Sequence, residues 1–134
     1  MKILIDTNVI LDVLFDRPQF IGDSITVLHM CEDGFAKGMV TAKAVADIYY
    51  FVRKQLRSEA KARAVLRKLM TLVSVCDVGA ERITEALDTE NGDYEDAIMA
   101  ACAKAEGCSL IITRNKKHFT GTGVKCLTPE EFVI

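Results

Sequence analysis

The sequence lacks most features that identify a secreted, zinc-binding or membrane protein. It has five cysteines, an odd number without any C-x-x-C spacing, and only two histidines. A disulfide framework and a zinc site are both disfavoured, because neither histidine lies near a pair of cysteines. No apolar run approaches the ~20 residues of a membrane span. The apolar run after Lys2 is cut at Asp6, so no signal peptide is visible. We expect a cytoplasmic protein with reduced, buried thiols and no membrane contact.

Proline is also scarce, and the charges nearly balance. Two prolines, 50% hydrophobic residues and 27% charged residues are typical of an ordered globular chain. The length favours a single domain over residues 1–134, long enough for a real core. The net charge of −2, from 17 basic and 19 acidic residues, argues against a strongly basic nucleic-acid binder.

The charges are nevertheless segregated along the chain. From Arg53 to Lys68 the only acid is Glu59, and from Asp77 to Asp96 the only base is Arg82. One molecule could therefore have a phosphate-attracting face and a cation-attracting face. Two ordinary solvated helix faces explain the same pattern, and the sequence leaves both explanations open.

Short β-forming runs alternate with helical patterns. The predicted strands are 2–5, 39–41, 72–75, 109–113 and 124–127. The predicted helices are 7–15, 19–32, 59–70 and 79–87, two that begin at 42 and 93, and a terminal turn at 129–132. Asn91-Gly92 is a turn signal, and in the first helix Asp12 and Asp16 are expected to face solvent. Alternation with short connections predicts a parallel sheet of four to five strands with helices on both faces, a three-layer α/β/α sandwich.

Asp6 follows the buried run Ile3-Leu4-Ile5, where the chain turns from strand to helix. A carboxylate at this place is costly unless it is solvated, paired or bound to a metal. Ligands of open α/β sheets bind beyond the carboxyl ends of the strands. Asp6 is therefore a candidate site residue, although a helix cap explains it about as well.

Two further helices bring carboxylates to the same edge. Asp93 and Asp96 stand three apart in the first turn of their helix, so they share a face. A capping role explains Asp93 better than Asp96, because an alanine-rich, buried stripe follows Asp96. Asp47 lies in a nearly all-apolar stretch, and Lys43 is its ordinary partner at i−4.

Asp6, Asp47 and Asp96 within a few ångströms would repel by about 1–4 kcal/mol per pair. Such a cluster persists only if a cation offsets the repulsion or a proton is taken up. Hard oxygen ligands without histidine or cysteine favour Mg²⁺ or Mn²⁺. A carboxylate-held ion is well suited to phosphodiester hydrolysis.

Taken together, these motifs resemble a PIN domain. The resemblance rests on four segments in family order, which are ILIDTNVIL at 3–11, Val40-Thr41 with Asp47, DAIMAA at 96–101 and LIITRN at 110–115. It implies an α/β sandwich with Mg²⁺- or Mn²⁺-dependent ribonuclease activity. Bacterial members are typified by VapC toxins, whose antitoxin inserts into the active site. It therefore implies RNA and an antitoxin protein as partners, and members that often pair as homodimers; the apolar helices at 19–32 and 59–70 could supply a dimer face.

The resemblance assigns roles to particular residues. Asp6, Asp47 and Asp96 match the family acids and are the expected catalytic residues, although the second acid is more often Glu. Asn115 stands where many members have a fourth Asp, so Asp93 could supply the missing charge beside Asp6 and Asp96 at the metal. The residues expected to support the site or bind phosphate are Asn8, Thr113, Arg114, Asn115, Lys116 and Lys117. The basic segment Arg53–Lys68 is expected to carry the RNA flank.

Two alternatives remain open. A catalytically weak or silent PIN module that binds RNA or a protein is permitted by Asn115 and by the shorter Asp47. A phosphatase with an aspartyl nucleophile also places Asp after its first strand. It is disfavoured because Asn8 stands where that chemistry needs a second Asp.

Overall fold

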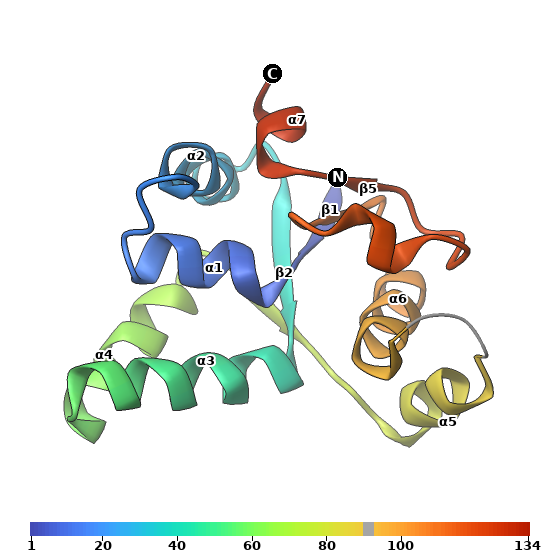
Figure 1. The fold of residues 1–134 in the computed structure, drawn as a ribbon, viewed down its shortest axis with the longest axis horizontal. Coiled ribbons are helices and arrows are strands. Elements are labelled where there is room, and N and C mark those ends of the chain that lie inside the picture. Colours follow the sequence, from blue (N-terminus) through green and yellow to red (C-terminus); the bar gives the residue numbers. More distant parts are fainter. Residues whose placement is uncertain (90–92) are drawn as a thin grey trace.

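The computed structural model describes residues 1–89 and 93–134, in which a parallel sheet lies between two layers of helices (Figure 1). The strand order is β3-β2-β1-β4-β5, and every neighbouring pair is parallel. The strands are β1 (Lys2–Ile5), β2 (Lys37–Thr41), β3 (Ser74–Cys76), β4 (Leu110–Ile112) and β5 (Cys126–Leu127). The expected parallel sheet is confirmed, and the carboxyl ends of its strands meet at one edge.

The helices divide between the two faces of the sheet. The helical segments are α1 (Thr7–Leu14), α2 (Ile21–Glu32), α3 (Ala42–Leu56), α4 (Glu59–Leu69), α5 (Ala80–Asp88), α6 (Tyr94–Glu106), the 3-10 helix η1 (Lys116–Phe119) and α7 (Pro129–Val133). Helices α1 to α4 and α7 cover one face, and α5 and α6 cover the other (Figure 1). The expected three-layer sandwich is thereby confirmed.

The central strand β1 explains why both faces are covered. Ile3, Leu4 and Ile5 are fully buried. Ile3 and Ile5 join the core under α1 to α4, whereas Leu4 joins the core under α5 and α6. Successive side chains of a strand point to opposite faces, so a strand that is apolar throughout requires a helical layer on each side.

Most predicted elements are present, with boundaries shifted by a few residues. The strand expected at 72–75 is Ser74–Cys76, and the polar turn expected after Thr113 continues into η1. Gly107 ends α6 with φ 71°, a left-handed conformation that glycine adopts without strain. The turn predicted at Asn91-Gly92 lies outside the described residues.

Asp12 is placed differently from the expectation that it faces solvent, because its exposed fraction is 0%. Arg114 donates from Nε to Asp12 Oδ2 at 2.8 Å and from Nη2 to Oδ1 at 3.2 Å. Arg17 donates from Nη1 to Asp12 Oδ1 at 3.0 Å. The Arg114 guanidinium also lies 4.0 Å from the ring centroid of Phe20. Two arginines thus neutralise a carboxylate that the helical pattern alone assigns to the surface.

The cysteines agree in part with the expectation of reduced, buried thiols. All five cysteines are free, and Cys76 and Cys102 are buried, whereas Cys31, Cys108 and Cys126 are partly exposed. Burial raises the pKa of the Cys31 thiol to about 11. Within residues 1–89 and 93–134, no helix has both the length and the apolar character needed to cross a bilayer.

The apolar sides of the helices suggested for a dimer face pack inside the chain. Val27 and Leu28 of α2, and Ala62 and Leu69 of α4, are buried in the core. Homodimerisation therefore stays a prediction, without support from these two helices.

Candidate active site

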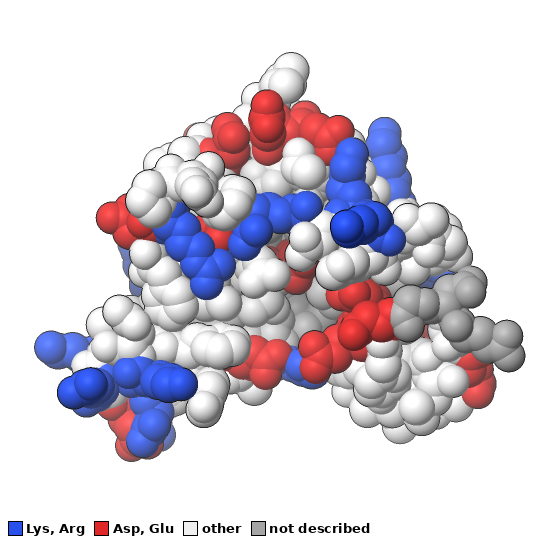
Figure 2. All heavy atoms as spheres, viewed as in Figure 1, with Lys and Arg blue, Asp and Glu red and all other residues white. Residues whose placement is uncertain are grey.

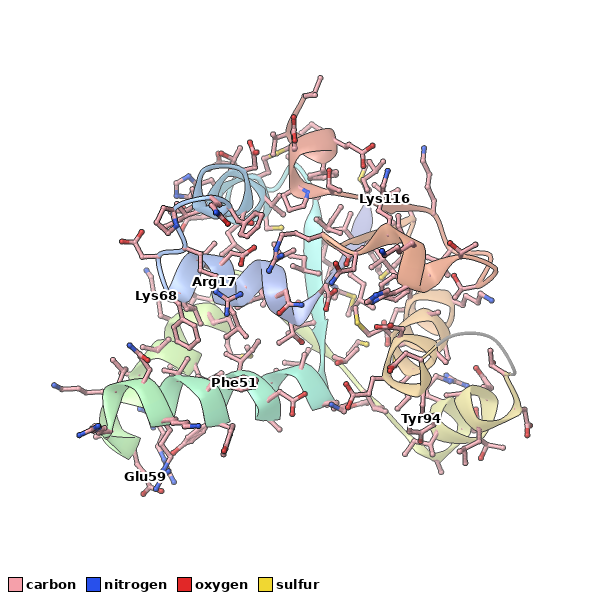
Figure 3. All side chains as sticks on the ribbon, in the orientation of Figure 1. Arg17, Phe51, Glu59, Lys68, Tyr94 and Lys116 are labelled. Carbon is pink, nitrogen blue, oxygen red and sulfur yellow. The ribbon has the colours of Figure 1, made fainter. Side chains whose placement is uncertain are left out.

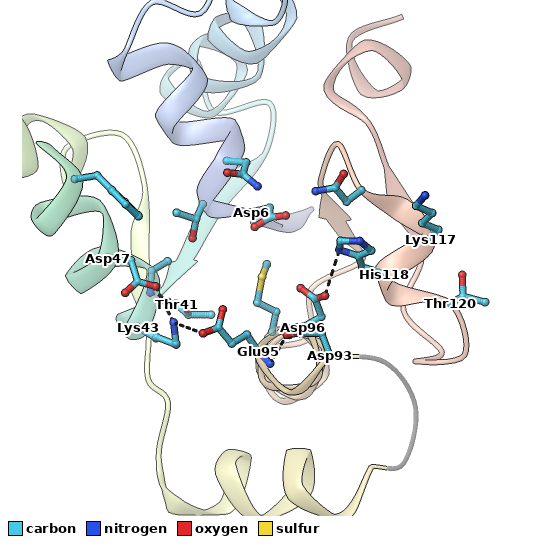
Figure 4. Close-up of a pocket in the computed structure, with 16 residues that line it drawn as sticks. Asp6, Thr41, Lys43, Asp47, Asp93, Glu95, Asp96, Lys117, His118 and Thr120 are labelled. Carbon is cyan, nitrogen blue, oxygen red and sulfur yellow. Dashed lines mark hydrogen bonds and ion pairs between the residues drawn. The ribbon is translucent and has the colours of Figure 1, made fainter. Parts of the chain in front are cut away.

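An open cavity of about 880 Å³ lies at the carboxyl edge of the sheet (Figure 4). Its wall is formed by the end of β1, the first turns of α3 and α6, and the loop that carries η1. In a parallel sheet with antiparallel crossover helices, strand ends and helix beginnings share one edge. We name this space the acidic cavity, because its lining includes Asp6, Asp47, Asp93, Glu95 and Asp96.

Asp6 is held by a side-chain bond from the neighbouring strand. The Thr113 hydroxyl donates from Oγ1 to Asp6 Oδ2 at 2.8 Å. Asp6 stands at the N-cap position of α1, but its side chain makes no capping hydrogen bond. Burial raises the pKa of Asp6, even though Thr113, the backbone N–H of Thr7 and the charge of Arg114 act to lower it. The capping explanation therefore fails to account for where this carboxylate points.

Asp96 lies on α6 and is half-buried. Its pKa is also raised, mainly by burial and then by the negative charge of Asp93, with Asp6 adding to the effect. His118 Nδ1 lies 3.4 Å from Asp96 Oδ2 and offsets part of this repulsion (Figure 4). The negative charge of Asp6 thus contributes to the raised pKa of Asp96 across the cavity, as a neighbouring carboxylate does.

Asp93 caps α6, as its position at the start of the helix suggested. Its Oδ1 accepts from the backbone N–H of Glu95 at 2.7 Å and of Asp96 at 3.2 Å. The side chain still lines the acidic cavity. Its role as a metal ligand remains a prediction, because one oxygen is already committed to the helix backbone.

Asp47 lines the same cavity but faces Lys43. Lys43 Nζ donates to Asp47 Oδ2 at 2.7 Å and lies 3.3 Å from Glu95 Oε1. These contacts raise the pKa of Lys43, chiefly through the bond to Asp47, so the ammonium stays charged. The Asp47 side chain is 44% exposed. Lys43 therefore bridges α3 and α6, and Asp47 has the ordinary i−4 partner that the sequence offered (Figure 4).

Asn8, Thr113 and Asn115 are close to Asp6, as expected of supporting residues. Thr113 is fully buried, and its Oγ1 accepts from the backbone N–H of Asn115 at 3.0 Å while donating to Asp6. Asn8 and Asn115 both line the acidic cavity. The hydroxyl thus fixes the Asp6 carboxylate and the start of the following loop together.

Arg114 and Lys116, expected to bind phosphate, are outside the cavity lining. Arg114 is turned away and engaged with Asp12. Lys116 Nζ donates to Glu131 Oε2 at 2.9 Å on the surface. Lys117 of the same loop does line the cavity. Lys116 and Lys117 are successive residues of the 3-10 helix η1, so their side chains point in different directions, and sequence order alone does not reveal which one faces the site.

His118 and Glu95 line this cavity, and neither was predicted as a site residue from the sequence. His118 lacks the nearby pair of cysteines that a zinc site would need. The signal that identifies it is its position three residues after Asn115, in the loop that leaves the carboxyl end of β4.

The chemistry of the lining fits a hard divalent cation in part. Asp6 and Asp96 offer carboxylate oxygens whose charged forms are destabilised by burial, so a nearby cation would stabilise both. Asp47 is held by Lys43, and the described residues contain no group of three or more His, Cys, Asp or Glu side chains close enough to hold an ion. Asp6 and Asp96 would supply the first two ligands, and a third would have to come from Asp47, which Lys43 holds, or from Asp93, which caps α6.

Comparisons with known proteins agree with this architecture. The family model described as PIN domain matches residues 2–117. Ribonuclease VapC1 of Aquifex aeolicus (strain VF5) is 25% identical over 136 residues, covering 98% of this chain and 92% of that protein.

Solved structures give the same picture of the fold. VapBC2 from Rickettsia felis, bound to a promoter DNA fragment, has a TM-score of 0.72 at 16% identity, covering 96% of this chain and 98% of that one. A toxin-antitoxin complex from Klebsiella pneumoniae has a TM-score of 0.67 at 20% identity, covering 94% of this chain and 96% of that one. The structural likeness shows a shared fold, and the family match spans most of the sequence. The chain belongs to the PIN domain family.

Proposed function

We propose that this protein is a Mg²⁺- or Mn²⁺-dependent endoribonuclease that hydrolyses RNA phosphodiester bonds at the acidic cavity. The observation that carries the proposal is the pair Asp6 and Asp96, two carboxylates with raised pKa values that face one cavity. Family membership and a curated relative named as a ribonuclease support the same chemistry.

Each residue of the cavity has a role in this proposal. Asp6 and Asp96 hold the ion, and Thr113 fixes the orientation of Asp6. Asp47 either orients the attacking water or joins the ligands when Lys43 releases it. When bound, the ion polarises water and offsets negative charge on the phosphate. Lys117 and His118 line the cavity beside these acids and contact the phosphate of the substrate.

The test is cleavage of a single-stranded RNA with Mn²⁺ by the wild type and by Asp6→Asn. We expect Asp6→Asn to lose at least about 100-fold in rate, the scale on which a preorganised charge-stabilising group acts. Asp33→Asn is the matched control, because Asp33 is an exposed acid outside the cavity lining. Equal cleavage by all three proteins would assign the activity to a contaminating nuclease and reject the proposal.

Metal binding gives a second readout that is independent of activity. Mn²⁺ at 100 times its Kd would stabilise the wild type by about 2.7 kcal/mol and raise its Tm. Asp6→Asn should lose most of this gain, whereas Asp33→Asn should keep it. An unchanged wild-type Tm with Mn²⁺ would contradict the metal site.

A catalytically silent module that binds RNA or a protein is the second candidate. The observation that favours it is the Lys43–Asp47 pair, which leaves the cavity with two prepared carboxylates. It predicts RNA binding that is insensitive to EDTA, together with no Mn²⁺-dependent gain in Tm.

We further propose that the chain is the toxin of a toxin–antitoxin pair, since one of its structural neighbours is a toxin-antitoxin complex. Expression of the wild type without a partner should arrest bacterial growth, and Asp6→Asn should relieve the arrest. Equal growth of the two strains would contradict a toxin role.

A further inference from the structure

Helix α3 presents two different faces along its length. Ala44, Ile48 and Val52 are buried against the sheet at a spacing of four residues. Asp47, Phe51 and Lys54 follow one another at spacings of four and three, so they share a second face, which lies beside the buried one; we call it the outward face. This face begins at the acidic cavity and runs toward the junction of α3 and α4.

Two aromatic rings are exposed next to the cavity. The Phe51 side chain lines the acidic cavity, yet Phe51 is 43% exposed and its neighbour Tyr50 is 58% exposed. Their ring centroids are 5.5 Å apart at an interplanar angle of 72°. Figure 3 labels Phe51 on α3. An exposed aromatic ring in the wall of the acidic cavity offers a flat surface on which a nucleic-acid base can stack.

A basic hollow lies at the far end of the same helix. Arg53, Lys54 and Arg57, with Ser58 and Glu59, line a space of about 370 Å³. Arg53 lies 3.7 Å from Glu59, whereas Lys54 and Arg57 have no acid within 4 Å in the described part of the chain. In Figure 2 Lys and Arg gather over this end of α3 and α4, and Asp and Glu gather around the hollow between α3 and α6.

The acidic cavity, the exposed rings and the basic hollow follow one another along α3 at short distances. The rise of an α-helix places Lys54 about 10 Å along the axis from Asp47, with Phe51 between them. A cationic groove next to aromatic rings is the arrangement by which proteins bind single strands without reading their sequence. The excess of cations favours a polyanion over a second copy of the chain, which would bring the same cations to the interface.

We propose that the outward face of α3 is the binding track for single-stranded RNA, with one base stacked on Phe51 and the following phosphates on Lys54 and Arg57. The proposal rests on the ribonuclease function, because the track would position the RNA strand whose phosphate is cleaved in the acidic cavity. It adds that the substrate needs an unpaired base beside the cleaved bond.

The test is fluorescence anisotropy with a labelled single-stranded RNA in EDTA, where cleavage by a metal-dependent enzyme is stopped. Phe51→Ala should weaken binding by about 5- to 100-fold, the range for one stacked base. Tyr94→Ala is the matched control, because Tyr94 is also an aromatic residue that is 43% exposed but does not line the cavity. It should change the affinity by less than about twofold.

An abasic scan locates the stacked base. Each RNA of the scan lacks one base. For one or two positions of the missing base, the affinity of the wild type should fall, whereas the affinity of Phe51→Ala for the same RNAs should not change. If Phe51→Ala does not fold, Phe51→Leu takes its place. It keeps an apolar side chain without the ring and should show the same loss of RNA affinity.

The salt dependence tests the cations. Lys54→Gln and Arg57→Gln should each reduce the slope of log K against log salt by about 0.7. Lys37→Gln should leave the slope unchanged, because Lys37 is exposed at the first residue of β2, at the edge of the sheet away from the cavity.

The outcomes separate the track from the ribonuclease function. Wild-type binding by Phe51→Ala, or equal losses for Phe51→Ala and Tyr94→Ala, would overturn the track even if the enzyme cleaves RNA. A Phe51→Ala variant that becomes monomeric in sedimentation while binding RNA normally would overturn it in favour of a dimer face. A protein that never cleaves RNA but shows the expected binding pattern would reject the activity alone.

Discussion

Asp12 and Asp6 stand at opposite ends of α1, and the protein treats their charges differently. Asp12 has an exposed fraction of 0% and accepts hydrogen bonds from Arg17 and Arg114. Asp6 accepts from the neutral Thr113 hydroxyl, and its pKa is raised by burial. One carboxylate is neutralised by cations of the chain itself, and the other bonds to no lysine or arginine within residues 1–89 and 93–134.

The difference separates a structural acid from a candidate catalytic one. A buried carboxylate with two arginine partners stabilises the packing of α1 against the loop after β4, and it has little capacity for a further cation. Asp6 has a charge that burial disfavours, and so has Asp96 on the other wall of the cavity. Burying these two negative charges costs free energy in the folded protein, and a cation bound beside them would offset that cost.

The largest expected effect comes from removing a partner of Asp12. Arg114→Met should lower the free energy of unfolding by about 3 kcal/mol, because a fully buried carboxylate loses one of its two arginines. Lys116→Met is the matched control, since Lys116 belongs to the same loop but pairs with Glu131 on the surface. Urea denaturation measures both. Equal losses of stability would show that the ion pair between Arg114 and buried Asp12 contributes no more than a surface pair.

An intermediate effect is expected in the pH dependence of stability. Asp6 has a folded-state pKa above its ordinary value of 3.8, so the folded protein binds a proton more tightly than the unfolded chain. Stability should therefore fall as pH rises from 3.8 through the raised pKa, and the penalty should persist at higher pH. Asp6→Asn in EDTA should remove this part of the profile. An identical pH profile for wild type and Asp6→Asn would contradict the raised pKa.

The smallest expected effect concerns Asp47, a partly exposed acid whose partner is Lys43. Lys43→Gln should change the free energy of unfolding by less than about 1 kcal/mol, because the Lys43–Asp47 pair is partly exposed. Release of Asp47 should raise Mn²⁺ affinity about two- to fivefold by calorimetry, which is the equivalent of that interaction. Lys117→Gln, which removes a cation from the same cavity, controls for net charge. Equal gains in both variants would show that Lys43 does not restrain Asp47.

Much of the candidate site could be predicted from short stretches of sequence. The run Ile3-Leu4-Ile5 indicates a central strand, and Asp6 after it must lie at the carboxyl edge. Thr113 follows β4, which pairs directly with β1, so Asp6 and Thr113 are neighbours by register. These inferences succeed because parallel strands and their crossover helices share one geometry wherever they occur.

The errors arose where a side chain is oriented by residues far away in the chain. Asp12 was assigned to solvent by helical periodicity, yet its partner Arg114 is 102 residues away. Arg114 precedes η1, which contains Lys116, Lys117 and His118, and nothing in their order reveals which of them face the cavity.

The alternation of strands and helices, the parallel sheet, and the edge at which Asp6, Asp47 and Asp96 lie could all be predicted without the structure. These features depend on side-chain periodicity and on local backbone preferences, both of which are written in neighbouring residues. Only the tertiary structure decided which charges are matched. It gave Arg114 to Asp12 and His118 to Asp96 and left Asp6 with the Thr113 hydroxyl, whereas helical spacing alone already offered Lys43 to Asp47. The physical reason is that an ion pair is selected by distance in space and by burial, and neither can be read from separation along the chain.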